Sequence, residues 1–146
     1  MRKEPEFIYE QGKAICMLTD KNNKPIIGIA DCHPDDADME NEKTGYEIAF
    51  KRAKIASYRR YRDELKERLA ALNQLFYSMK MSKHFNPNSY ENRMLQRQIR
   101  LTKMDLDTAK EMIATEQQKL REYINAKDEF YKKIRSNRER KIKSSE

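Results

Sequence analysis

The sequence predicts an α+β fold in which a small N-terminal antiparallel β-hairpin or sheet precedes a long antiparallel two-helix coiled-coil hairpin. Apolar and β-branched residues concentrate before residue 33, whereas from residue 46 onward apolar residues recur at spacings of three and four. Charged residues make up 38% of the chain and glycine occurs only three times, which leaves little material for a globular core. We therefore expect an oligomer, because copies of the chain can complete each other's burial.

The predicted strands lie in residues 1–37. Residues 6–18 and 25–32 are apolar and β-branched, and the polar residues 20–24 between them favour a turn. They predict a β-hairpin, and a further short strand before it is an open alternative. The acidic connector, residues 33–44, places negative charge at the start of the next helix, where the helix dipole favours it.

The connector has a second interpretation as a metal site. Several of its side chains, with one aspartate before it, are of metal-ligating types, but they lack the glycine and the spacing of an EF-hand loop. We therefore favour helix capping and predict neither a metal nor a cofactor. The candidate ligands in this region are Asp31, His33, Asp35, Asp36 and Asp38.

Residues 38–137 predict two helices separated by a turn at 82–88. Pro87 disfavours helix at Asn86, and Asn88 followed by Glu91 resembles a capping box that starts the second helix. A short loop between two helices implies antiparallel packing. The basic residues 138–146 continue without apolar periodicity, so we expect a disordered tail. The two apolar stripes are Ile48, Ile55, Tyr58, Leu65, Leu69, Leu72, Phe76 and Met79, and then Leu95, Ile99, Thr102, Leu106, Ala109 and Ile113, continuing toward Ile134.

Charge and composition limit the classes of function. The chain carries a net charge of +7, divided as −4 over residues 1–45 and +11 over the remainder, and a basic surface attracts polyanions.

No apolar run approaches the roughly 20 residues of a membrane span, and two cysteines are too few for a disulfide framework. Three scattered glycines cannot build a phosphate loop, and HExxH and GxSxG motifs are absent, so we predict that the protein is not an enzyme. We expect a cytoplasmic protein.

A short motif in residues 28–55 resembles a known family. A strand ending in Gly-x-Ala-x-Cys-His-Pro-x-Asp is followed by an acidic connector, a glycine and a helix with an Ala-x-x-Arg-Ala core. Together with the hairpin before it and the helices after it, the chain resembles the first class of Thoeris anti-defence proteins, encoded by phages and prophages of Gram-positive bacteria. The matching residues are Gly28, Ala30, Cys32, His33, Pro34, Asp36, Gly45, Ala49, Arg52 and Ala53.

The resemblance implies a phage protein that acts as a sponge in the cytoplasm of the infected bacterial host. Such an oligomer, a dimer or a trimer of dimers, binds and sequesters glycocyclic ADP-ribose, a signal made by a bacterial TIR-domain protein, without cleaving it. Some members of the family are similar in holding cyclic oligonucleotides at a separate site. No membrane and no nucleic acid is an expected partner.

Under this resemblance we expect the ADP-ribose pocket at the loop between the helices, completed by a neighbouring subunit. Either Phe76 or Phe85 would stack on adenine, because aromatic faces suit purine rings. Arginine forks suit phosphate oxygens, and asparagine side chains suit ribose hydroxyls. The polar candidates are Asn86, Asn88, Arg93 and Arg97, and a second anion site would use Arg52, Arg59 and Arg60.

Two other functions remain open. A pI near 9.3 is typical of a nucleic-acid-binding module, although acidic residues interrupt the basic ones throughout 101–131. The heptads alone would also suit a coiled-coil module that docks on a host protein.

Overall fold

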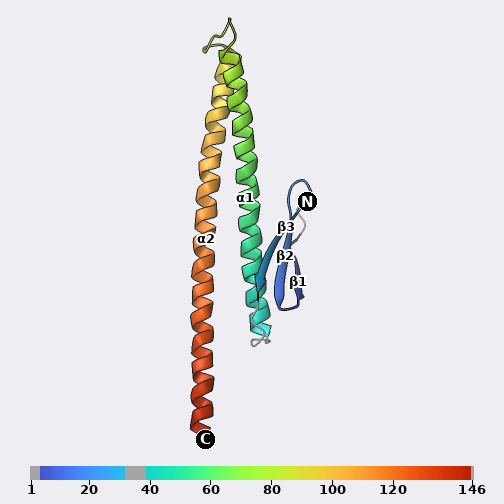
Figure 1. Cartoon of the computed structure of the whole chain (residues 1–146), viewed down its shortest axis with the longest axis vertical. Coiled ribbons are helices and arrows are strands. Elements are labelled where there is room, and N and C mark those ends of the chain that lie inside the picture. The colour runs from blue at the N-terminus through green and yellow to red at the C-terminus, as the bar shows by residue number, and fades with distance from the viewer. Residues whose placement is uncertain (1–3, 32–38, 146) are drawn as a thin grey trace. The chain divides into compact units, whose positions relative to one another are not determined.

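The computed structural model describes residues 4–31 and 39–145 (Figure 1). It confirms the predicted α+β fold, with an N-terminal three-stranded antiparallel sheet followed by a helical hairpin. The chain forms two compact units, which we call the sheet unit (residues 1–53 and 115–146) and the hairpin unit (residues 54–114). The elements are β1 (Glu6–Glu10), β2 (Lys13–Thr19), β3 (Pro25–Asp31), α1 (Met39–Lys80) and α2 (Tyr90–Ser145).

The sheet has the order β1-β2-β3, so the first predicted strand is divided into two. The division falls at Gln11 and Gly12, which have φ angles of 51° and 74° and form a two-residue turn. Such turns require two consecutive residues with positive φ and match the twist of the strands they join. Asp20 builds the second turn, because its Oδ1 accepts the N–H groups of Asn22 and Lys24 at 2.8 and 2.9 Å.

One face of the sheet is the core of the sheet unit. Side chains of β2 and β3 on this face pack against α1, and the buried cluster consists of four alanines and one cysteine. Small side chains let the backbones of sheet and helix approach closely. The other face carries Ile27 and Ile29, which are exposed. The buried cluster is Ala14, Cys16, Ala30, Ala49 and Ala53.

Gly28 marks the closest approach of the sheet to α1. A Cβ atom at this position would collide with the backbone carbonyl oxygen of Ala49 and the backbone nitrogen of Ala53. Backbone atoms cannot rotate away as a side chain can, so only glycine fits here. In the described part of the family-like motif, Gly28, Ala30, Ala49 and Ala53 therefore build the contact between strand and helix.

The hairpin unit has a coiled-coil-like core. Leu65, Leu106 and Ala109 form a buried cluster with Leu69 packed against it. The first part of the predicted stripe of α2 is confirmed, because its six members from Leu95 to Ile113 are buried, whereas Phe130, further along the predicted stripe, is 46% exposed. Thr102 occupies a buried position without cost, since its hydroxyl donates to the carbonyl oxygen of Gln98 at 2.7 Å.

The ends of α2 differ from the prediction. Ser89 caps the helix, because its Oγ accepts the backbone N–H of Asn92 at 3.3 Å. The cap thus lies one residue after the predicted pair of Asn88 and Glu91. At the other end the helix continues through residues 138–145, where we expected a disordered tail. Arginine, lysine and glutamate are good helix formers, and neither glycine nor proline follows Pro87, so nothing in the sequence stops the helix.

None of the helices, as far as the structure describes them, is long and apolar enough to cross a membrane.

Candidate functional site

The predicted aromatic residues meet at the end of the hairpin unit. The ring centroids of Phe76 and Phe85 lie 6.1 Å apart, with the ring planes at 73°, an edge-to-face arrangement. The Lys80 ammonium lies 4.9 Å from the centroid of Phe76, within the range of a cation–π contact. Both rings are only half-buried, so each retains accessible surface. We call Phe76, Lys80 and Phe85 the tip cluster.

Asn86 and Asn88 lie together in the turn that follows. The Asn86 side chain accepts the backbone N–H of Asn88 at 3.0 Å, and the Asn86 carbonyl oxygen accepts Nδ2 of Asn92 at 2.6 Å. Asn86 therefore has a structural role in the turn, because its side chain replaces a backbone acceptor. Both predicted asparagines are exposed.

Asn92 was not among the residues predicted from the sequence. Its side chain is 4% exposed, and Nδ2 donates to Asn86 O and to Ser89 Oγ at 2.6 and 2.9 Å. The Oδ1 atom is buried without a hydrogen-bond partner in the described structure. Ser89 followed three residues later by Asn92 is a variant of the capping box, with asparagine in place of glutamate or glutamine, and this variant could have identified the residue.

Arg93 and Arg97 are exposed on the first turns of α2. They are four residues apart and therefore lie on the same side of the helix. All six residues predicted for the first site belong to the hairpin unit. The structure brings Phe76 to Phe85 and Asn86 to Asn88, and within the described residues no hydrogen bond or ion pair joins the Arg93 or Arg97 side chain to the tip cluster.

The three arginines predicted for a second anion site are divided between the units. Arg52 belongs to the sheet unit, where Nη1 donates to the carbonyl oxygen of Ile29 at 2.7 Å. This bond covers a backbone acceptor of β3, an edge strand. Arg59 and Arg60 follow one another in the hairpin unit, Arg59 exposed and Arg60 half-buried.

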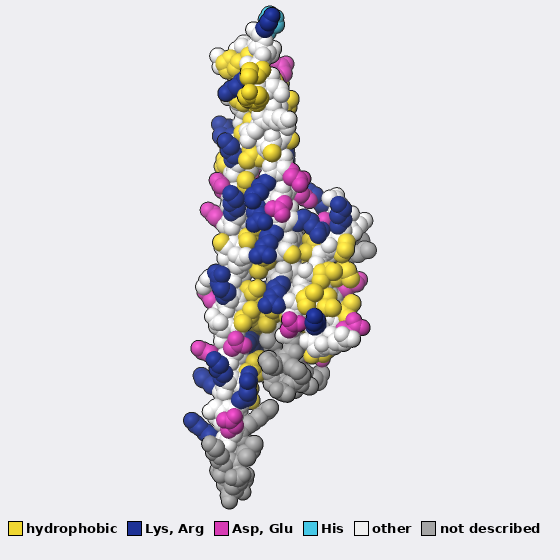
Figure 2. All heavy atoms as spheres, in the orientation of Figure 1, with side chains coloured by type: hydrophobic (Ala, Val, Ile, Leu, Met, Phe, Trp, Pro, Cys, Tyr) yellow, Lys and Arg dark blue, Asp and Glu magenta, His cyan; other side chains and the backbone are white. Residues whose placement is uncertain are grey.

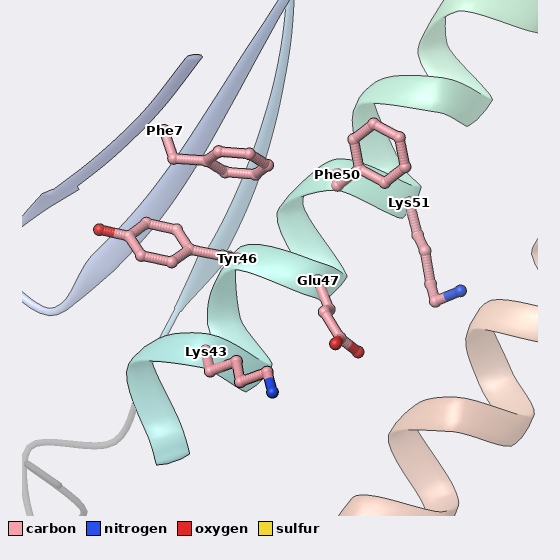
Figure 3. A pocket seen from close by; sticks show the side chains of 6 residues that line it. All are labelled: Phe7, Lys43, Tyr46, Glu47, Phe50 and Lys51. Atoms are coloured by element: carbon pink, nitrogen blue, oxygen red, sulfur yellow. The ribbon is translucent and has the colours of Figure 1, made fainter. Parts of the chain in front are cut away.

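The sheet unit contains an aromatic concavity that the sequence did not reveal. Phe7 reaches from β1 toward α1, where Tyr46 and Phe50 lie beside it, with ring centroids 5.2 and 6.5 Å from that of Phe7 (Figure 3). The concavity has a volume of about 500 Å³, within the usual range of ligand pockets. Its lining is Phe7, Lys43, Tyr46, Glu47, Phe50 and Lys51.

A polar network lies beside this concavity, between α1 and α2 within the sheet unit. Burial raises the pKa of the Tyr123 hydroxyl well above its ordinary value, and a hydrogen bond with Glu47 raises it further. The Lys51 ammonium lies 5.4 Å from the centroid of the Tyr123 ring. Thr44 Oγ1 and the Tyr131 hydroxyl are hydrogen-bonded at 3.1 Å.

The remaining candidates lie mostly outside the described residues. No cluster of three metal-ligating side chains occurs among the described residues, and four of the five candidate ligands, His33, Asp35, Asp36 and Asp38, lie outside them. Cys32 also lies outside the described residues, whereas Cys16 is buried in the core, where burial raises the pKa of its thiol.

Comparison with protein-family models, with curated proteins and with solved structures finds no match for this chain. The likeness to the Thoeris anti-defence proteins therefore stays a prediction that depends on the short motif in residues 28–55.

Proposed function

We propose that this protein binds glycocyclic ADP-ribose at the tip of its hairpin unit and sequesters the signal without cleaving it, as a phage protein that counters bacterial defence. The observation that carries the proposal is the tip cluster. Phe76 and Phe85 offer accessible aromatic surface, and Lys80 adds a cation next to it. Adenine stacks on aromatic side chains, and each such stack contributes about 1–3 kcal/mol.

Two arginines could bind the phosphate groups of such a ligand. A cyclic ADP-ribose contains a pyrophosphate, and arginine binds phosphate oxygens through two parallel N–H donors. Arg93 and Arg97 project from the first turns of α2, shortly after the turn that contains Asn86 and Asn88. Asn88 is exposed and could donate to ribose oxygens. In this proposal Asn86 shapes the turn, because its side chain already accepts the Asn88 N–H.

The test of sequestration is calorimetric titration of the purified protein with glycocyclic ADP-ribose, followed by heating and chromatography of the released ligand. We expect saturable binding and recovery of the intact ligand. Cleaved ligand would contradict sequestration. No heat of binding, together with steeply salt-dependent binding to DNA of any sequence, would favour a nucleic-acid-binding module instead.

An exposed apolar row on α2 supports the oligomer that we also propose. Its apolar members are seven, three and eight residues apart, and they lie on a side of the helix that does not contribute to the buried stripe. Apolar side chains at this spacing favour a second helix, and a second copy of the chain provides one. Arg97 lies on the same side of the helix as the row, so pairing of two copies would bring its charge close to their interface. The phosphate of a bound ligand would neutralise that charge. The row is Met94, Leu101, Met104 and Met112.

Charge favours antiparallel pairing of the two copies. Arg100 and Asp107 occupy equivalent heptad positions beside the row, on either side of its centre. Antiparallel helices would set Arg100 of one copy against Asp107 of the other, whereas parallel helices would oppose like charges. Light scattering should give a mass above that of one chain, and Leu101→Glu should reduce it. A monomeric wild-type protein would contradict this part of the proposal.

The same row supports the second candidate function, a coiled-coil module that docks on a host protein. Such a module needs the row and does not need the tip cluster. Phe85→Ala would leave a module of this kind fully active, whereas the signal-binding proposal expects Phe85→Ala to weaken ligand binding.

A further inference from the structure

The two edges of the sheet differ in how well they are protected. β3 begins at Pro25, which has no N–H to offer a further strand, and Arg52 covers the carbonyl oxygen of Ile29. It ends at the charged Asp31. Proline and charged side chains on an edge strand are common means of preventing further strand pairing. β3 is therefore a closed edge.

β1 has charged residues at its two ends, Glu6 and Glu10, but its central residues are apolar and include no proline. All five of its residues are exposed, and three consecutive large hydrophobic side chains, Phe7, Ile8 and Tyr9, are 44%, 46% and 39% exposed. Apolar side chains gather over the sheet in Figure 2. An exposed hydrophobic edge strand is a ready template for another strand. β1 is therefore the edge at which a partner can add to the sheet.

The register shows which backbone groups face the open edge. Glu10 and Lys13 close the two-residue turn and so form a hydrogen-bonded pair, and alternation makes Ile8 and Ile15 the next such pair. Phe7 lies between these positions, so its N–H and carbonyl oxygen point away from β2. No hydrogen bond to these two atoms is found within the described part of the chain. A strand added at β1 would pair with them.

The aromatic concavity lies beside this edge. Phe7 lines it, together with Tyr46 and Phe50 of α1, and the side chains of Lys43 and Lys51 line it as well (Figure 3). Alternate side chains of an added strand would point toward the same face as Phe7. An aromatic side chain there would meet aromatic rings in edge-to-face or offset contact. The concavity thus selects an aromatic residue.

Charged side chains on the outer face of β1 select the residues of the added strand that lie opposite them. Glu6 and Glu10 flank Ile8 on the outer face of β1. If two copies of β1 paired antiparallel with full overlap, Glu6 of each copy would lie opposite Glu10 of the other. Like charges directly opposite one another destabilise strand pairing. Lysine or arginine at these positions of a partner strand would instead form ion pairs.

From these features we infer that β1 is a docking edge for an extended segment of a partner protein with the alternating pattern basic, aromatic, apolar, aromatic, basic. The segment adds to the sheet as a fourth strand. Its backbone pairs with Phe7, one aromatic side chain enters the concavity, and its basic side chains meet Glu6 and Glu10. Strand addition of this kind derives affinity from the backbone and specificity from pockets for alternate side chains. This inference does not depend on the proposed nucleotide site, which lies in the other unit.

The test uses the full chain and a capped peptide, Lys-Phe-Val-Phe-Lys, whose palindromic order fits a parallel or an antiparallel strand. Calorimetry should show saturable binding. The same peptide N-methylated at both Phe residues and at Val keeps its charge and side chains but loses the amide protons that can pair with the Phe7 carbonyl oxygen in either strand direction, so we expect binding at least tenfold weaker. Equal binding of the two peptides, or no binding of either, would overturn the inference.

Charge reversal provides the matched control. Glu6→Lys combined with Glu10→Lys should abolish binding of the basic peptide and create binding of Glu-Phe-Val-Phe-Glu. The exposed Glu67→Lys combined with Glu111→Lys makes the same change of net charge in the hairpin unit and should leave peptide binding unchanged. If both double variants lose the basic peptide equally, attraction is non-specific and β1 is not the docking edge.

Discussion

The Cα of Gly28 faces the backbone carbonyl oxygen of Ala49 so closely that a methyl group cannot fit between them. Gly28 lies on β3 and Ala49 on α1, and this contact sets how the sheet packs on the helix within the sheet unit. Phe7 of β1 lies beside Tyr46 and Phe50 of α1. The aromatic concavity therefore also depends on how the sheet packs on α1.

Gly28→Ala should therefore destabilise the protein strongly. Overpacking costs about 1–3 kcal/mol, and we expect the upper end because the obstacle is backbone. Urea unfolding followed by circular dichroism measures the loss. Ile27→Ala, at the neighbouring exposed position, is the control and should cost clearly less. An unchanged unfolding midpoint for Gly28→Ala would contradict the close contact.

Asn92→Ala should destabilise the hairpin unit by about 1–2 kcal/mol, because it removes the side-chain donor to the Asn86 carbonyl and part of the helix cap. Asn92→Asp should cost more, since a carboxylate at this buried position cannot donate to either oxygen. The effects of Ser89→Ala and Asn92→Ala should not add, because the two side chains share a hydrogen bond. Urea unfolding of the single and double variants tests this. Additive losses would show that the two residues act independently.

Stability should fall at alkaline pH because of Tyr123. Its pKa is raised in the folded protein, first by burial and then by Glu47, so the folded state holds this proton at a pH where the unfolded chain loses it. The stability that the protonated Tyr123 hydroxyl contributes is complete below the ordinary tyrosine pKa near 10. It is lost as the pH rises toward the pKa of Tyr123 in the folded protein. Unfolding at pH 8 and at pH 10.5 should show a larger loss for the wild type than for Tyr123→Phe. Equal losses would place Tyr123 in contact with solvent.

The sequence predicted the elements that depend on local patterns. Heptad spacing identified the buried stripe of α2, and Pro87 identified the turn between the helices. The turn at Gln11 and Gly12 was missed, because the apolar character of residues 6–18 suggested one continuous strand. The signal present was Gly12, whose positive φ suits a two-residue turn.

The sites were less predictable, because they depend on contacts between distant segments. Phe76 and Phe85 were expected as alternatives, and the structure places them in contact. Asn86 was expected to face a ligand, yet its side chain completes the turn. Phe7 lies beside Tyr46 and Phe50 only because the sheet packs on α1 at Gly28. No local sequence pattern predicts this packing.

Parallel calorimetric titrations of four proteins with glycocyclic ADP-ribose decide whether the tip of the hairpin unit binds this ligand. Phe85→Ala and Arg97→Ala should each weaken the affinity of the wild type at least tenfold, through loss of the aromatic shelf and of a phosphate contact. Tyr77→Ala is the control, because Tyr77 is 62% exposed in the same unit and lies outside the tip cluster. Wild-type affinity in all three variants, or no binding by the wild type, would show that the tip cluster does not bind this ligand.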